Sequence, residues 1–231
     1  MEILGLSFSQ FLSGILSIVV MDLVLAGDNA IVIGMACRNL PKRLRLKGII
    51  LGTIGAVVVR VLATLAIVWL LKISGLMLGG GLLLLYIGYK LLAKTVGHSG
   101  VEGKDSLLSA VLTVIAADAV MGIDNILAIA GASHGSYPMV IIGLAISIPI
   151  MVFGSTVIIK LMDRFPVVID IGAAVIAYTA GKMITEEPFL RGFFDERPAL
   201  KYAVMAVAVV GVLFAGNMAK RRKKARAENS S

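Results

Sequence analysis

Two stretches of the chain carry the same arrangement of acidic and amide side chains: an Asp, five intervening residues, then Asp-Asn. The first stretch contains Asp22, Asp28 and Asn29, and the second contains Asp118, Asp124 and Asn125. Carboxylate and amide oxygens suit Mg²⁺, Ca²⁺ or Mn²⁺, whereas Zn²⁺ and Cu⁺ generally recruit imidazole or sulfur. We therefore interpret these six residues as candidate ligands of a divalent cation, and we expect no catalytic residue among them.

The elements that carry these residues belong to a chain that is too apolar for a soluble protein. Of its 231 residues, 58% are hydrophobic and 16% are charged, whereas soluble domains average about 45–50% and about 25%. The apolar stretches predict an all-α polytopic membrane protein, with seven transmembrane helices in a single transmembrane domain over residues 1–231. These stretches cover residues 9–37, 48–71, 74–94, 107–131, 138–161, 167–185 and 201–219. The single cysteine, Cys37, excludes an internal disulfide and a thiolate metal cluster.

Lysine and arginine gather where the apolar stretches end. Five of the basic residues lie within 38–47, and six more lie within 220–226. Because basic connections stay on the cytoplasmic side, we expect a multi-pass protein of the cell membrane with its N-terminus outside. The basic tail, 220–231, is then cytoplasmic, and the acidic connection 186–200 lies outside. This rule explains the basic clusters better than nucleic-acid binding does, so we expect no nucleic-acid partner.

The two motifs are 96 positions apart, and each lies in the first of three consecutive predicted spans. Because three is odd, the first and fourth spans cross the membrane in opposite directions, as in the inverted repeats of secondary transporters. The expected units are repeat one at about 9–94 (spans 1–3), repeat two at about 107–185 (spans 4–6) and a seventh helix at about 201–219. Asp22 should then lie at the membrane depth of Asp124. Asp28 should lie at the depth of Asp118.

The position of four carboxylates inside predicted spans favours a functional site. A charged residue at the centre of a membrane helix costs about 2.5–3.5 kcal/mol on insertion scales. On an unbroken helix, Asp22 and Asp28 are about 9 Å apart along the axis and could not ligate one ion together. Two arrangements remain open: carboxylate rungs stacked along a pathway, or one compact site formed by unwinding at Gly27 and Gly122.

Other residues inside the spans have their own expectations. Arg60 lies at the centre of the second span and needs an acidic partner. It is either part of a static ion pair or a charge partner of a motif Asp that is displaced during transport. Lys182, near the end of the sixth span, is expected at the membrane interface. Gly79–Gly81 in the third span predict close helix packing, with a hinge as the alternative.

At its two motifs the sequence resembles the TerC family of integral membrane proteins, part of a wider group of cation and amino-acid exporters. The resemblance rests on segments 22–29 and 118–125 and extends over the seven-span layout, most of residues 9–219. It implies export of a metal ion, in particular Mn²⁺, as the transported substrate, and supply of that metal to enzymes being secreted. The acidic motif residues of the family map onto the six candidate ligands. Asp22 stands where many relatives have Glu, and Asn125 stands where many have Ser, which alters the ligand set.

The sequence therefore favours an exporter of a divalent cation, first of all Mn²⁺, that works by alternating access and is not an enzyme. The alternatives are a Ca²⁺ or other cation antiporter, a basic amino-acid exporter and, more remotely, an intramembrane aspartyl protease. The protease motif Gly-x-Gly-Asp is incomplete here, since Ala26 and Gly27 precede Asp28 and Leu25 stands in place of the first glycine. The expected partners are the metal ion and the lipid bilayer, with no organic cofactor. A secretion-machinery partner and a homo-oligomer are left open.

Overall fold

A computed structural model describes the backbone of residues 2–3, 6–66, 73–93, 103–123, 129 and 136–228, and the side chains of 11–20, 27–66, 73–93, 107–123, 129 and 136–222. The helices are α1 Phe8–Arg38, α2 Lys42–Leu65, α4 Leu76–Ala93, α5 Gly103–Met121, α7 Tyr137–Arg164, α8 Val167–Thr185, α9 Pro188–Asp195 and α10 Pro198–Glu228. An antiparallel pair of two-residue strands, β1 Glu2–Ile3 and β2 Leu6–Ser7, precedes α1. The predicted all-α class is confirmed for the described chain from Phe8 onward.

Several helices have the length and composition of membrane spans. Five of those described are long and apolar enough to cross a bilayer: α2, α4, α7, α8 and the 198–222 portion of α10. The two helices that carry the acidic motifs contribute shorter described apolar stretches, Phe11–Val20 in α1 and Leu107–Met121 in α5. The chain is therefore a multi-pass membrane protein.

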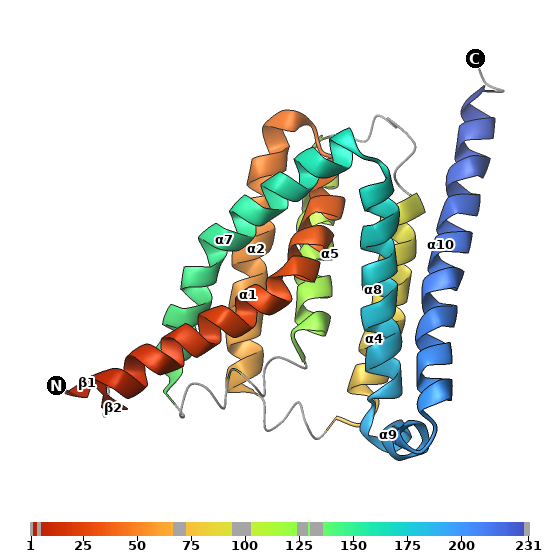
Figure 1. The fold of residues 1–231 in the computed structure, drawn as a ribbon. Coiled ribbons are helices and arrows are strands. Elements are labelled where there is room, and N and C mark those ends of the chain that lie inside the picture. The colour runs from red at the N-terminus through yellow and green to blue at the C-terminus, as the bar shows by residue number, and fades with distance from the viewer. Residues whose placement is uncertain are drawn as a thin grey trace.

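The helices pack in pairs that are far apart in the sequence (Figure 1). The most extensive contacts join α1 to α7, α4 to α8, α8 to α10 and α2 to α5, and α10 also packs against α4 on the outside of the bundle. Helices α1 and α7 are strongly tilted, whereas α4, α8 and α10 stand nearly parallel to one another. The motif-bearing α1 and α5 also contact each other directly, which brings the two motifs into one region of the bundle.

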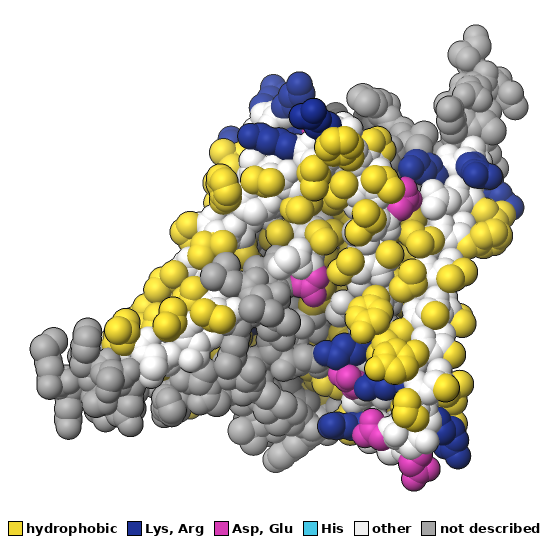
Figure 2. All heavy atoms as spheres, viewed as in Figure 1, with side chains coloured by type: hydrophobic (Ala, Val, Ile, Leu, Met, Phe, Trp, Pro, Cys, Tyr) yellow, Lys and Arg dark blue, Asp and Glu magenta, His cyan; other side chains and the backbone are white. Residues whose placement is uncertain are grey.

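Two charged ends border an apolar band on the face shown in Figure 2. Lys and Arg side chains gather at the end where α1 passes into α2, and mixed charges lie around α9 at the opposite end. At the basic end, Arg38 Nε and Arg45 Nη1 lie 3.4 and 2.8 Å from the carboxylate oxygens of Asp163, near the end of α7. This distribution matches a bundle whose middle faces lipid and whose ends face water.

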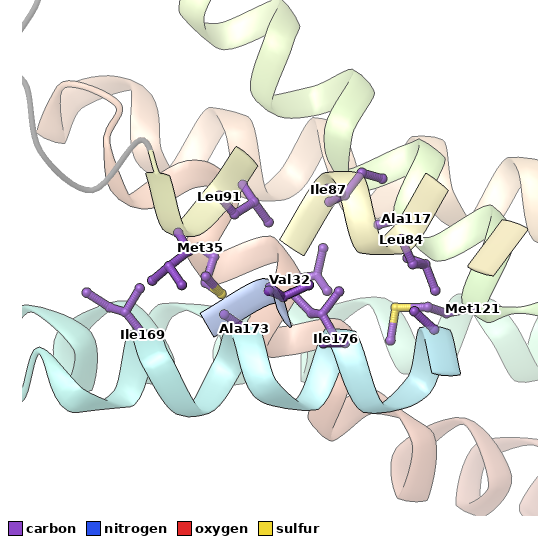
Figure 3. Close-up of a cluster of buried hydrophobic side chains, with 14 of the residues drawn as sticks. Val32, Met35, Leu84, Ile87, Leu91, Ala117, Met121, Ile169, Ala173 and Ile176 are labelled. Atoms are coloured by element: carbon purple, nitrogen blue, oxygen red, sulfur yellow. The ribbon is translucent and has the colours of Figure 1, made fainter. Parts of the chain in front are cut away.

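The main hydrophobic core lies between α1, α4, α5 and α8 (Figure 3). Val32 from α1 and Ile176 from α8 converge there with Leu84 from α4. Ala117 and Met121 of α5 belong to the same cluster and lie on either side of the second motif's first aspartate in the sequence. Apolar packing therefore fixes the position of the backbone that carries the motif.

Glycines allow close contact between these helices, as predicted. A methyl group at Gly81 of α4 would lie 2.8 Å from the carbonyl oxygen of Ala180 in α8, closer than real side chains approach. A methyl group at Gly52 of α2 would lie 3.0 Å from Val114 of α5. Because α4 runs unbroken from Leu76 to Ala93, no hinge interrupts the helix at these glycines. Gly80 and Gly81 act in packing, whereas Gly79 has open space beside it.

The connection between α8 and α10 contains a helix, α9, that the sequence did not predict. Next to it, Glu187 is fully buried, and its carboxylate accepts hydrogen bonds from the backbone N–H groups of Gly75 (2.8 Å) and Leu78 (3.0 Å) at the start of α4. Gly75 adopts φ +83°, a left-handed conformation that glycine tolerates well. The last helix also exceeds its predicted end at 219 and continues through the basic cluster to Glu228.

Candidate functional site

A buried ion pair between α2 and α5 marks the candidate site. The Arg60 guanidinium contacts the carboxylate of Asp118, and the two side chains are only 1% and 5% exposed. Removing one partner of such a pair generally costs about 3–5 kcal/mol, because the other charge stays buried and uncompensated. The sequence-based expectation that Arg60 needs an acidic partner is met by the first aspartate of the second motif.

The helical repeat of α2 explains why Arg60 faces inward. Buried residues recur every three or four positions along α2, and this spacing places Thr53, Val57, Arg60 and Thr64 on one face. That face packs against α5. Thr64 Oγ1 donates a hydrogen bond of 2.8 Å to the backbone oxygen of Arg60. The apolar α2–α5 contact thus holds the guanidinium in the membrane interior.

The first motif meets the same guanidinium from α1. Asp28 is half-buried, and its Oδ1 accepts a hydrogen bond of 2.9 Å from the backbone N–H of Asn29. Its carboxylate also lies close enough to Arg60 and Lys182 to interact electrostatically with both. Arg60 therefore forms an ion pair with Asp118 of the second motif and lies within electrostatic range of Asp28 of the first, the two aspartates that were predicted to share a membrane depth.

Asn29 adds an amide with an unused polar atom. The side chain is 3% exposed, and its Nδ2 has no hydrogen-bond partner among the residues that the structure describes. A buried polar group without a partner costs about 1–3 kcal/mol. Because the oxygen and nitrogen of an amide exchange positions on rotation by about 180°, the same place can present an oxygen ligand to a cation.

The backbone differs between the two motifs. Helix α1 is continuous through Gly27, so the structure does not show there the unwinding that one of the two open arrangements, the compact site, requires. Helix α5 ends at Met121, and Gly122 follows in a turn with its N–H donating to the Asp118 carbonyl oxygen at 2.7 Å. A methyl group at Gly122 would lie 3.4 Å from Arg60 Nε, so the missing side chain lets the guanidinium pack directly against the turn.

Only part of the predicted ligand set lies within the described residues. The structure brings Asp28 and Asp118 near Arg60 and places Asn29 beside Asp28, whereas Asp124 and Asn125 lie outside the described ranges. The side chain of Asp22 is also outside them, although its backbone belongs to α1. In the described part of the chain, no three His, Cys, Asp or Glu side chains gather as a metal site.

Lys182 is a charged group whose link to the site the sequence did not reveal. Its Nζ lies 3.7 Å from Glu186, and its side chain is 42% exposed, in keeping with the predicted interfacial position. Its interaction with Asp28 across α1 and α8 depends on how these helices pack, and no spacing in the sequence indicates it. The Glu186 carboxylate also forms an ion pair with Lys201 Nζ at 3.1 Å.

Carboxylates and a guanidinium enclosed by apolar helices are an arrangement typical of membrane transporters. A family model of the integral membrane protein TerC family matches residues 7–224. The chain belongs to that family.

Relatives support the assignment. The chain is 40% identical over 206 residues to the uncharacterized membrane protein YjbE of Bacillus subtilis, covering 89% of this chain and 94% of that protein. It is 26% identical over 193 residues to a UPF0053 protein of Haemophilus influenzae, covering 74% of this chain and 81% of the relative. No solved structure matches the chain.

Proposed function

We propose that this protein exports a divalent cation, first of all Mn²⁺, through a site of paired aspartates in the membrane interior. The observation that carries the proposal is the buried Arg60–Asp118 pair with Asp28 beside it. A bilayer disfavours such groups strongly enough that charged residues inside spans generally line ion or substrate pathways. Membership of the TerC family points the same way.

The chemistry of the side chains favours a hard, doubly charged ion. The proposed ligands are Asp22, Asp28, Asn29, Asp118, Asp124 and Asn125. They supply only carboxylate and amide oxygens, the donors that Mn²⁺, Ca²⁺ and Mg²⁺ accept. The unused amide atom of Asn29 supports a role for this residue as a ligand. Arg60 is already engaged by Asp118, which disfavours a basic amino acid as substrate because the amino acid's own carboxylate would need that cation.

The packing of the helices supports two inverted repeats. In the two repeats, α1 corresponds to α5, α2 to α7 and α4 to α8. If each helix is replaced by its counterpart, the contact of α1 with α7 becomes the contact of α5 with α2, and the contact of α4 with α8 stays the same. These are the most extensive contacts among the six helices of the two proposed repeats. The helices α1, α2, α4, α5, α7, α8 and α10 also run alternately between the two ends of the bundle (Figure 1), which supports seven crossings. Such a relation favours alternating access around a site between the halves.

The charge distribution supports an orientation in the membrane, which defines the two sides between which the cation moves in this proposal. The basic end joins α1 to α2, and the C-terminal end of α10 lies on the same side (Figures 1 and 2). By the positive-inside rule this end faces the cytoplasm, which places the N-terminus outside. We propose that the cation leaves toward the side of α9, where secreted proteins could receive it.

Reconstitution of the purified full-length chain into liposomes tests this function. We expect Mn²⁺ to cross wild-type proteoliposomes, as followed by a trapped fluorophore that Mn²⁺ quenches. Asp28→Asn and Asp124→Asn each remove one charged ligand and should lower the rate by about tenfold or more. Asp195→Asn is the matched control, because Asp195 is exposed and pairs with Arg191 at 3.4 Å, away from the site.

Competition by Ca²⁺ and Mg²⁺ in the same assay ranks the substrates. If none of the three ions moves, or if both site variants transport at the wild-type rate, the proposed function is wrong.

A further inference from the structure

We propose that Arg60 is a built-in counter-ion that pairs with the Asp118 carboxylate when the cation site is empty. The empty transporter can then change back to its starting conformation without carrying a second ion. This inference rests on the proposed function. It assigns to Arg60 a role in the return step, which is separate from cation binding itself.

The first argument is the position of the guanidinium. Arg60 contacts Asp118, a proposed ligand, and lies close enough to Asp28, a ligand from the other motif, to interact with it. Both partners of the ion pair are almost fully buried. A cation that binds Asp118 must therefore take over the carboxylate that Arg60 now holds, and the two positive charges compete for one place.

The second argument is chemical. Arginine keeps its charge at every physiological pH, so the compensation is permanent and needs no proton from solution. Because the guanidinium belongs to the chain, it cannot be released on either side of the membrane. When the cation leaves, Arg60 can return to Asp118 and remove the cost of an uncompensated carboxylate in the bilayer.

The third argument is local space. Gly122 presents no side chain toward Arg60 Nε, where a methyl group would lie at 3.4 Å, so this position of the turn places no side chain against the guanidinium. Asp28 offers a second carboxylate from α1 within electrostatic range. Displacement from Asp118 therefore leaves Arg60 near a negative charge.

Comparing exchange with net transport tests the inference. Exchange of Mn²⁺ for Mn²⁺ across proteoliposomes requires only the loaded transporter to move, whereas net efflux also requires the empty one to return. In Arg60→Gln we expect net efflux to fall by about tenfold or more, since Asp118 then crosses uncompensated. Exchange should stay within about threefold of wild type, because the bound cation compensates the carboxylates.

A double variant and a surface control separate this role from a static ion pair. Arg60→Gln combined with Asp118→Asn removes both charges, so its ratio of net efflux to exchange should return to the wild-type value even if both rates are lower. Arg45→Gln loses a contact with Asp163 and a hydrogen bond to the Leu40 carbonyl oxygen, both at the basic end and away from the site, and should keep the wild-type ratio. If Arg60→Gln does not fold, as judged by size-exclusion chromatography, the ratio of the double variant decides.

Three results would overturn the inference. Equal losses of exchange and net efflux in Arg60→Gln, which leave their ratio unchanged, would make the pair merely structural. No loss of either rate would make Arg60 irrelevant to the return step. A ratio of net efflux to exchange that stays below the wild-type value in the folded double variant would contradict compensation of the Asp118 charge by Arg60. If the wild-type protein moves no divalent cation in either mode, the proposed function itself fails. That result differs from one in which the wild type transports the cation but Arg60→Gln has the same ratio of net efflux to exchange, which overturns only the role of Arg60.

Discussion

At the scale of single residues, the membrane interior makes polar groups costly unless they find partners, and the site follows from that constraint. Arg60 and Asp118 compensate each other, and Asp28 interacts with the same guanidinium. Asn29 differs from these residues, because its buried Nδ2 has no hydrogen-bond partner in the described part of the chain. Its retention is easier to explain by binding than by stability.

Asn29→Ala tests that distinction. We expect the Mn²⁺ concentration at half-maximal transport to rise several-fold, about 3- to 10-fold, because one candidate oxygen ligand is lost. The free energy of unfolding should change by no more than about 1 kcal/mol, since an unpartnered buried amide contributes little to folding. Transport kinetics in proteoliposomes and thermal unfolding in detergent measure the two effects. A large loss of stability with unchanged Mn²⁺ affinity would assign Asn29 a structural role instead.

At the scale of secondary-structure elements, helix packing sets the distance between charged side chains. Glycine brings α2 near α5 and α4 near α8, and apolar side chains from α1, α4, α5 and α8 fill the core beside the second motif (Figure 3). Glu187 stabilises the start of α4 from the α8–α9 connection. The ion pair therefore depends on apolar contacts made by residues far from it in the sequence.

Two neighbouring glycines of α4 allow a matched test of this packing. A methyl group at Gly81 would lie 2.8 Å from the Ala180 carbonyl oxygen, whereas one at Gly79 would meet nothing within 4 Å. We expect Gly81→Ala to lower the free energy of unfolding by about 1–3 kcal/mol through overpacking. Gly79→Ala should be neutral or stabilise the protein by up to about 1 kcal/mol, because alanine favours helix. Thermal unfolding that ranks the variants in the opposite order would refute the close α4–α8 contact.

At the scale of the whole molecule, charge is divided between two ends of an apolar bundle. The basic end contains the α1–α2 connection, and the other end contains α9 with its mixed charges (Figure 2). The positive-inside rule turns this asymmetry into an orientation. If the basic end faces the cytoplasm, as this rule leads us to expect, export corresponds to movement of the cation toward the side of α9.

Labelling with a membrane-impermeant thiol reagent tests the orientation. The chain's own Cys37 is 0% exposed and should not react, so a single introduced cysteine reports its side of the membrane. Asp195→Cys, on the exposed surface of α9, should be labelled in intact cells. Arg221→Cys, exposed in the basic part of α10, should be labelled only after the membrane is opened. The reverse pattern would invert the topology and contradict export.

How much of this could be predicted from sequence depends on the range of the interactions. The apolar stretches predicted an all-α membrane protein and the helices that carry the motifs. The position of the charged Arg60 inside a predicted span indicated that it needs an acidic partner, but not which residue that partner is. Local patterns did not reveal α9, the buried carboxylate of Glu187 at the start of α4, or the extension of α10 to Glu228.

The sequence by itself determined that the chain enters a membrane and that its buried charges must be compensated, because both follow from transfer free energies that each residue carries wherever it lies. Only the tertiary structure decided that Asp118 is the residue that pairs with Arg60, that Lys182 lies within electrostatic range of Asp28, and that α1 passes Gly27 without a break. Those outcomes depend on how helices distant in the sequence pack together. Periodicity along one helix shows which face is buried but not which neighbour covers it.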